Sequence, residues 1–263
     1  MKERRIQYLR PEQIIREREK NSLVFLPLGP VEWHGPHLPM GVDALRAEAA
    51  ALFLASRLGG LVLPTLFVGT ERERSGEMLR NIGFSGEEYI VGMDFPANLL
   101  ASLYYREETL AVVLKDLLEM VVNRWSFKRV VLVNGHGAEN HLQVLRRLQN
   151  EFNARGSGWI LLVMPMVNYP NGSWSHATLE ETATMMFLYP SGVRLKALPS
   201  LPEKLKNVRW AIVDDSTFRG KPTADFTVRE EEDPRLARKI IGKRLWKMTT
   251  RQLTAFLKSE LNR

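Results

Sequence analysis

The chain has 263 residues, of which 44% are hydrophobic, and it carries a formal net charge of +7. This length can fill one α/β domain without division, so we expect a single domain over residues 1–263. The sequence contains no cysteine, which excludes disulfides, thiolate metal sites and cysteine nucleophiles. Any metal must therefore be held by histidine nitrogens and carboxylate oxygens.

The ends of the chain and its basic charge bear on location and partners. Residues 1–10 are charged and lack the apolar stretch of a secretion signal, and no apolar run approaches the roughly 20 residues needed to cross a bilayer. Much of the basic surplus sits near the two ends without an interleaved aromatic stripe, which is typical of a solvated surface. We therefore expect a cytoplasmic protein that binds neither membranes nor nucleic acid.

The first half of the chain alternates between helical and strand-like patterns. After a short polar helix at Pro11–Lys20, the apolar run 22–28 is typical of a buried parallel strand. An Ala- and Leu-rich stretch predicts a helix over 44–58, and strand-like residues return at 61–68. Residues 71–96 are polar and weakly periodic, which indicates a long loop or an excursion from the domain.

The second half continues the alternation. A strongly amphipathic pattern predicts a helix over 107–125, followed by a buried strand at 129–133 and a helix over 139–153. The next predicted elements are a strand at 159–164, a helix at 178–189, a fourth or edge strand at 208–213 and a basic helix or helix pair at 234–261. Strands separated by helices imply right-handed crossovers, so we expect an α/β fold, a three-layer sandwich with a mainly parallel central sheet.

Histidine and carboxylate residues cluster where the predicted strands end. In open α/β sheets, ligands bind beyond the carboxyl ends of the strands. Three stretches at such positions combine histidine with carboxylate: EWHGPHLPMGVD at 32–43, NGHGAEN at 134–140 and WSHATLEET at 174–182. A lone histidine is usually structural, but three such clusters are hard to explain as packing. Histidine nitrogen with carboxylate oxygen suits Zn, Mn or Fe.

The same stretches resemble, in order, the signature blocks of the creatininase (creatinine amidohydrolase) family. LPLGPVEWHGPHLPMGVD is similar to the first block, which runs from an apolar strand through Glu, His, His and Asp. VVLVNGHGAEN is similar to the second block, commonly Asn-Gly-His-Gly-Gly-Asn, and HATLEETATMM to the third, His-Ala-Gly-Glu-x-Glu-Thr-Ser-x-Met. The blocks span roughly residues 22–190, and the first is long and specific.

The resemblance implies a site with two divalent metals, generally Zn, Mn or Fe. Matched residue by residue, Glu32 and His34 belong to opposite metals, and Asp43 bridges the pair. His136 is expected to ligate one metal, and Glu181 in the third block to supply the remaining ligand.

The position of that last ligand has an alternative. The creatininase subgroup takes a glutamate two residues after the histidine of the second block, where this chain has Ala138. Glu139 lies one residue further along, so it is a second candidate ligand, unless it only begins the following helix.

The expected chemistry is hydrolysis of a C–N amide-type bond. A water held between two metals becomes acidic enough near neutral pH to attack a carbonyl carbon, whose oxygen a metal polarises. His176 is expected to carry a proton to the leaving nitrogen, with a structural hydrogen-bonding role as the alternative. His37 is expected to orient a ligand rather than bind metal, and Gly35 and Gly135 to allow tight turns beside the ligands.

Departures from the family blocks limit the substrate prediction. Phe95-Pro-Ala-Asn98 stands where the family usually carries Phe-Pro-Gly-Thr, and the third block reads His-Ala-Thr-Leu rather than His-Ala-Gly-Glu. Family members open small rings, deformylate aminopyrimidine intermediates or cleave a modified peptide. We expect a small-molecule substrate, a cyclic amide or a formamide, with a modified peptide as the alternative.

Other hypotheses stay open at this level. A metal-binding or ligand-binding protein that has lost turnover would explain why the second and third blocks depart from the family sequence. A nucleic-acid role for the basic surface is the weakest hypothesis. The resemblance also implies a homo-oligomer, since creatininase-like proteins form rings that are often hexamers.

Overall fold

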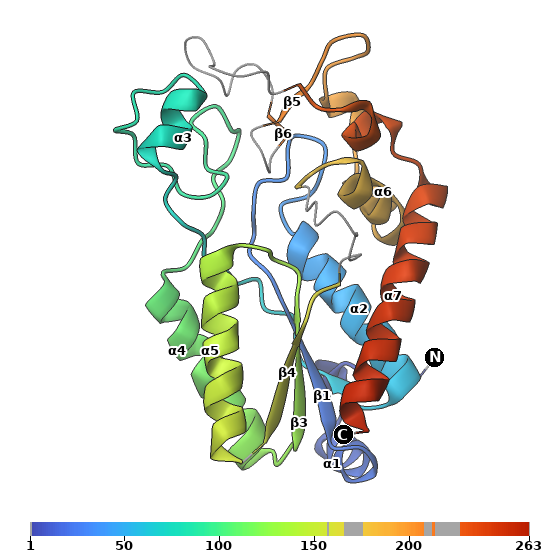
Figure 1. Cartoon of the computed structure of the whole chain (residues 1–263). Coiled ribbons are helices and arrows are strands. Elements are labelled where there is room, and N and C mark those ends of the chain that lie inside the picture. The colour runs from blue at the N-terminus through green and yellow to red at the C-terminus, as the bar shows by residue number, and fades with distance from the viewer. Residues whose placement is uncertain (1, 157, 166–175, 208–211, 214–226, 263) are drawn as a thin grey trace.

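The computed structural model describes residues 2–156, 158–165, 176–207, 212–213 and 227–262. Its centre is a four-stranded parallel sheet in the order β2-β1-β3-β4, which lies between helices on both sides (Figure 1). The strands are β1 (Leu23–Leu28), β2 (Leu61–Val62), β3 (Arg129–Asn134) and β4 (Trp159–Val163). β1 pairs with β3 from its first residue to its last, so these two central strands end at the same level. The expected α/β fold with a parallel sheet is confirmed.

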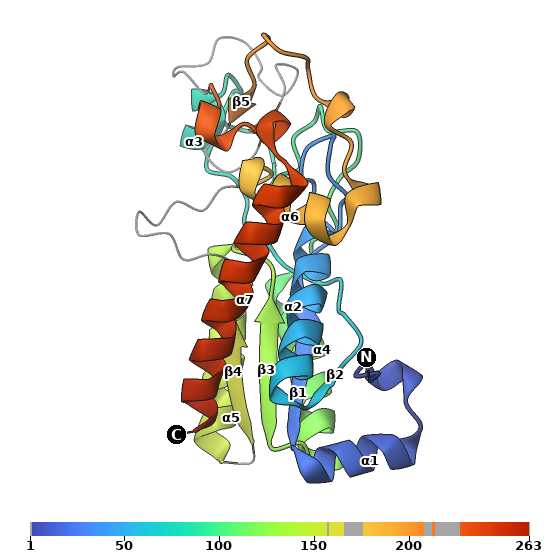
Figure 2. The ribbon, with the colours of Figure 1, turned by 90° about the vertical axis from the view of Figure 1, so that its right-hand side faces the viewer.

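Alternation along β1 creates two separate apolar cores. Val24, Leu26 and Leu28 pack on the side of α4 (Glu107–Glu119) and α5 (Glu139–Arg155). Leu23 and Phe25 pack on the opposite side against α2 (Val42–Leu58) and α7 (Lys239–Leu261). Figures 1 and 2 show these two helix pairs on opposite faces of the sheet. Every β1 side chain is buried because both faces are covered, which explains why its sequence is a continuous apolar run.

The remaining elements are short. They are the helices α1 (Pro11–Lys20), α3 (Gly76–Asn81) and α6 (Leu179–Leu188), and the 3-10 turns Ile6–Tyr8, Pro190–Gly192, Leu195–Ala197, Glu230–Glu232 and Pro234–Leu236. Among the described parts of the chain, no helix combines the length and the apolar character needed to span a bilayer.

Three predicted elements differ in extent from those observed. Within residues 61–68, only Leu61–Val62 forms a strand, and Leu66 adds a single parallel bridge to Leu28. The helix predicted over 107–125 is α4 followed by a π-helical turn at Met120–Arg124. The C-terminal stretch is a 3-10 turn followed by α7. Periodicity in the sequence reports which face is buried, but it does not report the exact hydrogen-bond spacing.

Residues 71–96 form a small folded excursion, one of the two forms that we expected for this stretch. This excursion contains α3 and has its own cluster of buried side chains, made of Leu79, Ile82, Phe84, Ile90, Met93 and Phe95. The buried side chains follow turns rather than one regular period, so a pattern search does not detect them.

The candidate strand at 208–213 does not extend the central sheet in the part that is described. Residues 208–211 lie outside the described residues, and β6 (Ile212–Val213) pairs antiparallel with β5 (Lys206–Asn207). These two strands form a separate two-stranded sheet.

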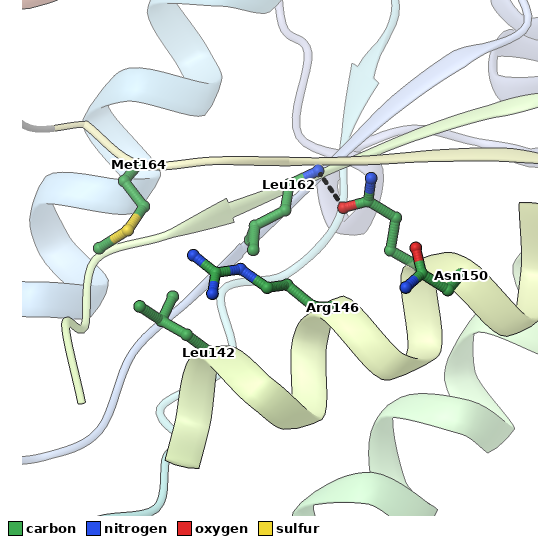
Figure 3. A pocket seen from close by; sticks show the side chains of 6 residues that line it. Leu142, Arg146, Asn150, Leu162 and Met164 are labelled. Atoms are coloured by element: carbon green, nitrogen blue, oxygen red, sulfur yellow. Dashed lines mark hydrogen bonds between the residues drawn. The ribbon is translucent and has the colours of Figure 1, made fainter. Parts of the chain in front are cut away.

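The edge strand β4 is covered by amide side chains of α5. Asn153 donates to the carbonyl oxygen of Ile160 at 2.9 Å and accepts from its backbone N–H at 2.7 Å. Gln149 accepts from the Leu162 N–H at 3.2 Å, the bond drawn in Figure 3. The groove beside them is lined by Leu142, Arg146, Gln149, Asn150, Leu162 and Met164 (Figure 3). It contains none of the expected site residues.

Candidate metal centre

Four elements deliver the expected ligands to one end of the sheet. Glu32 and His34 follow β1, and His136 follows β3, so both segments lie beyond the carboxyl ends of adjacent strands. Asp43 lies in the first turn of α2 and Glu181 in the first turn of α6. The positive end of a helix dipole stabilises a carboxylate in this position.

Two glycines allow α2 to approach the strand ends closely. A Cβ at Gly135 would lie 2.1 Å from the Asp43 carbonyl oxygen, and one at Gly29 would lie 2.6 Å from the Asp43 Cβ. Any larger residue at either position would push Asp43 away from the centre. Gly35 has a φ of +76° and makes the tight turn that we expected, whereas Gly135 is required for this close approach.

Asp43 is shared between two groups of potential ligands. Its Oδ1 lies 3.4 Å from His34 Nε2, and its Oδ2 lies 3.0 Å from His136 Nδ1. The two groups are Glu32, Asp43 and His136, and His34, Asp43 and Glu181, each with ligand atoms within 4.8 Å of one another. Ligand atoms around one tetrahedral zinc ion are about 3.4 Å apart, given bonds of roughly 2.0–2.1 Å. Each group therefore has the dimensions of one metal site.

Hydrogen bonds fix the orientation of both histidine rings. His34 Nδ1 donates to the Glu32 carbonyl oxygen at 3.0 Å, and His136 Nε2 donates to the Thr70 carbonyl oxygen at 3.2 Å. In a neutral ring, the form that binds a metal, the other nitrogen would then present its lone pair to a cation. His34 Nε2 has no hydrogen-bond partner among the described residues, although carboxylate oxygens of three residues lie 3.4–3.8 Å away. A cation between these atoms would satisfy both the nitrogen and the oxygens, so these residues fit a bound metal ion.

The charges of the centre shift the pKa values of its members in opposite directions. Burial raises the pKa of Glu32, but the rings of His136 and His176 outweigh burial and hold it at about 2. Burial lowers the pKa of His34, but the carboxylates of Asp43, Glu181 and Glu32 raise it to about 9. Such a concentration of buried carboxylates attracts positive charge, and metal ions compete with protons for these ligands.

Glu32 and Glu181 each have one carboxylate oxygen hydrogen-bonded to a side chain outside the centre. Tyr104 donates its hydroxyl hydrogen to Glu32 Oε1 at 2.6 Å, and burial together with Glu32 raises the pKa of this phenol, which keeps it protonated. Arg46 Nη1 donates to Glu181 Oε1 at 2.5 Å. We did not expect either residue from the sequence. Arg46 lies three positions after Asp43 on α2, which was an available clue, whereas Tyr104 belongs to no motif.

His176 lies at the edge of the same centre. Its Nδ1 lies 3.7 Å from Glu32 Oε2, its Nε2 donates to the Trp33 carbonyl oxygen at 2.7 Å, and its ring lies 4.0 Å from that of His34. Ala177, which follows it, is buried with a φ of +57°, an uncommon conformation for a residue other than glycine. The Ala177 N–H donates to Glu181 Oε2 at 2.7 Å, so this strained turn places His176 and Glu181 together.

Glu139 lies apart from the centre. Its side chain is 71% exposed and forms an ion pair with Arg72 at 2.7 Å. Among the described residues, the groups that could hold a metal include Glu181 but not Glu139. The geometry therefore favours Glu181 of the two candidates.

His37 and His141 are buried beside the centre without entering these groups. His37 Nε2 lies 2.9 Å from Thr182 Oγ1, one residue after Glu181. His141 accepts from the Thr70 N–H at 3.4 Å and donates to Asn134 Oδ1 at 2.9 Å. Because Thr70 also accepts from His136, His141 supports the orientation of that ring from behind.

Comparisons with known proteins identify the family to which the chain is similar. The sequence model described as "Creatininase: Creatinine amidohydrolase" matches residues 7–257. A mycofactocin precursor peptide peptidase from Mycobacterium tuberculosis is 28% identical over 210 residues, 76% of this chain and 75% of the relative. A creatinine amidohydrolase from Pseudomonas putida is 28% identical over 202 residues, 69% of this chain and 70% of the relative.

Solved structures show the same fold. A crystal structure of creatinine amidohydrolase superimposes with a TM-score of 0.68 at 19% identity, covering 99% of this chain and 98% of the other. A structure described as "Creatininase Mn" gives a TM-score of 0.68 at 20% identity, covering 98% and 99%. Because the family model spans nearly the whole sequence, the chain belongs to the creatininase family.

Proposed function

We propose that this creatininase-family protein is a hydrolase with two divalent metal ions that cleaves a C–N amide-type bond in a small cyclic amide or formamide. The observation that carries the proposal is the position of Asp43, whose two oxygens face histidine nitrogens of two different ligand groups. A purely structural ion pair does not need a carboxylate whose two oxygens face two different histidines. Two bound cations would polarise the scissile carbonyl and activate water for attack.

The residues of the chain take distinct roles in this proposal. Glu32 and His136 would hold one cation, His34 and Glu181 would hold the other, and Asp43 would contribute to both sites. Zn, Mn and Fe all suit this set of nitrogen and oxygen ligands. Among the similar creatininase structures, one is described as an Mn form and another as a mutant of Zn–Zn type.

His176 moves the proton in this scheme. Its Nε2 is held by the Trp33 carbonyl oxygen, which leaves Nδ1 directed toward Glu32 and the centre. This nitrogen can accept a proton from water and deliver it to the leaving nitrogen. Its burial and the nearby His34 lower its pKa, which favours the neutral, proton-accepting form before reaction.

A second candidate substrate is a modified peptide. Two relatives named mycofactocin precursor peptide peptidase match 76% of this chain, whereas the creatinine amidohydrolase from Pseudomonas putida matches 69%. The same centre would serve, since the bond broken is again an amide.

One experiment separates these possibilities. The protein is purified without chelators, its metal content is measured, and it is then depleted and reloaded with Zn²⁺, Mn²⁺ or Fe²⁺. Each form is assayed against cyclic amides including creatinine, against formamides and against modified peptides, with His136→Ala as the inactive control. Metal-dependent turnover in one class identifies the substrate class. Two bound metals without turnover in any class would support a binding protein, and an absence of bound metal would refute the proposal.

A further inference from the structure

We propose that Tyr104 is a positioning residue for metal binding, which acts by fixing the orientation of the Glu32 carboxylate. The inference rests on the proposed function, since it concerns one of the two metal sites. It assigns a role to a residue of the segment that follows the folded excursion, outside the three blocks that carry the proposed ligands.

The two oxygens of Glu32 have separate partners. Oε1 accepts the Tyr104 hydroxyl at 2.6 Å. Oε2 lies 3.5 Å from His136 Nδ1, 3.8 Å from His34 Nε2 and 3.7 Å from His176 Nδ1. The phenol therefore holds one oxygen away from the histidine nitrogens and leaves the other directed at them. Glu32 would bind a cation through a single oxygen.

Tyr104 is itself held in place on both sides. Its hydroxyl oxygen accepts from the Met93 N–H at 3.3 Å, so the hydroxyl hydrogen remains available for Glu32. The adjacent Leu103 N–H donates to the Val31 carbonyl oxygen at 2.8 Å, in an antiparallel bridge beside Glu32. This backbone hydrogen bond thus aligns the loop that carries Glu32 with the segment that carries Tyr104. The hydroxyl hydrogen is thus committed to Glu32, and one acceptor position of the hydroxyl oxygen to the Met93 N–H.

Removal of the hydroxyl should therefore affect the metal rather than the fold. In Tyr104→Phe, the Glu32 carboxylate can rotate or present both oxygens in the metal-free protein. Metal binding must then fix its orientation, which costs binding free energy. Outer partners of metal ligands typically contribute about 10–100-fold to metal affinity. Tyr104→Phe should weaken one of the two Zn²⁺ sites by that factor, and the other should change much less.

The first test is Zn²⁺ titration of the metal-depleted protein by calorimetry. The matched control is Tyr105→Phe, the same chemical change at the adjacent residue, whose side chain is 40% exposed. The inference predicts normal affinities for the control and one weakened site for Tyr104→Phe. Equal affinities in the two variants would overturn it.

A double-mutant cycle then identifies the site. If Tyr104 acts through Glu32, Tyr104→Phe should weaken Zn²⁺ binding in the wild type but not further in Glu32→Gln. An additive loss in the double variant would show that Tyr104 acts elsewhere and would refute the mechanism.

A third measurement separates positioning from a general loss of structure. Turnover of Tyr104→Phe should be low at limiting Zn²⁺ and should return as Zn²⁺ saturates the weakened site, which a misfolded variant would not show. If the wild-type protein binds no metal, the proposed function fails. If it binds two metals and Tyr104→Phe does so equally well, only the inference about Tyr104 fails.

Discussion

Arg46 and Glu181 form a buried ion pair across two helices, with Nη1 and Oε1 separated by 2.5 Å. Both side chains are less than 10% exposed, and Arg46 also donates to the Pro165 carbonyl oxygen at 3.2 Å. The pair joins α2, whose first turn carries Asp43, to the first turn of α6. It therefore fixes the distance between two carboxylates of the proposed centre.

Breaking this pair should destabilise the metal-free protein. Arg46→Met would leave the Glu181 carboxylate buried without its partner, and we expect the free energy of unfolding to fall by about 3–5 kcal/mol. Arg57→Met is the control, since Arg57 is an exposed residue of the same helix and its guanidinium lies 5.5 Å from the centre of the Phe53 ring. Denaturant unfolding in chelator measures the difference, and added Zn²⁺ should recover more stability in Arg46→Met than in the wild type. Equal stability of the two variants would contradict the role of the pair.

The metal content depends on the shared carboxylate. We expect close to two metal ions per chain, and Asp43→Ala should lose both because the bridge to each histidine disappears. Elemental analysis after purification without chelators measures this, with Asp116→Ala, an exposed aspartate on α4, as the control. Two retained metals in Asp43→Ala would disprove the bridging assignment.

His176 and His136 should respond differently to removal. His176→Ala should keep both metals while turnover falls by about 10²–10⁴-fold, the usual contribution of general acid–base catalysis. His136→Ala should lose metal and turnover together. Metal content and kcat measured on both variants decide the roles. Because His176 also forms a possible ligand group with Glu32 and His34, loss of metal from His176→Ala would make it a ligand.

The buried His141 should make stability depend on pH. Burial and the nearby His136 lower its pKa to about 3, below the unfolded value near 6.5. The unfolded state therefore binds more protons, so stability is complete above about pH 6.5 and falls as the pH drops toward 3. The slope approaches about 1.4 kcal/mol per pH unit for one proton. In chelator, unfolding between pH 6.5 and 5 should depend less on pH in His141→Gln than in the wild type, and identical slopes would refute this account.

The assembly state is a further expectation from the family resemblance. One chain has a mass of 30.2 kDa, and we expect a homo-oligomer, with a hexamer as the leading candidate. Light scattering at micromolar concentration gives the mass directly. A mass of a single chain would contradict the expectation.

The sequence alone determined the order of the main elements and the family. Continuous apolar runs such as 22–28 and 129–133 predicted strands that are covered on both faces, because every side chain of a central parallel strand is buried. The position of histidines and carboxylates after these strands predicted where a site would lie, since parallel strands end at one edge. The motifs also predicted the candidate metal ligands, which are Glu32, His34, Asp43, His136 and Glu181.

Only the tertiary structure decided which of the remaining side chains reach this centre. Tyr104 contacts Glu32 across 72 positions in the sequence, and Arg46 contacts Glu181 across 135. Glu139, one residue from the position that the creatininase subgroup uses, points instead to Arg72. Sequence periodicity reports the local environment of each segment, but the convergence of distant segments depends on how crossovers and turns orient them. For that reason the motifs could name the proposed ligands, whereas they could not name the residues that hold those side chains in position.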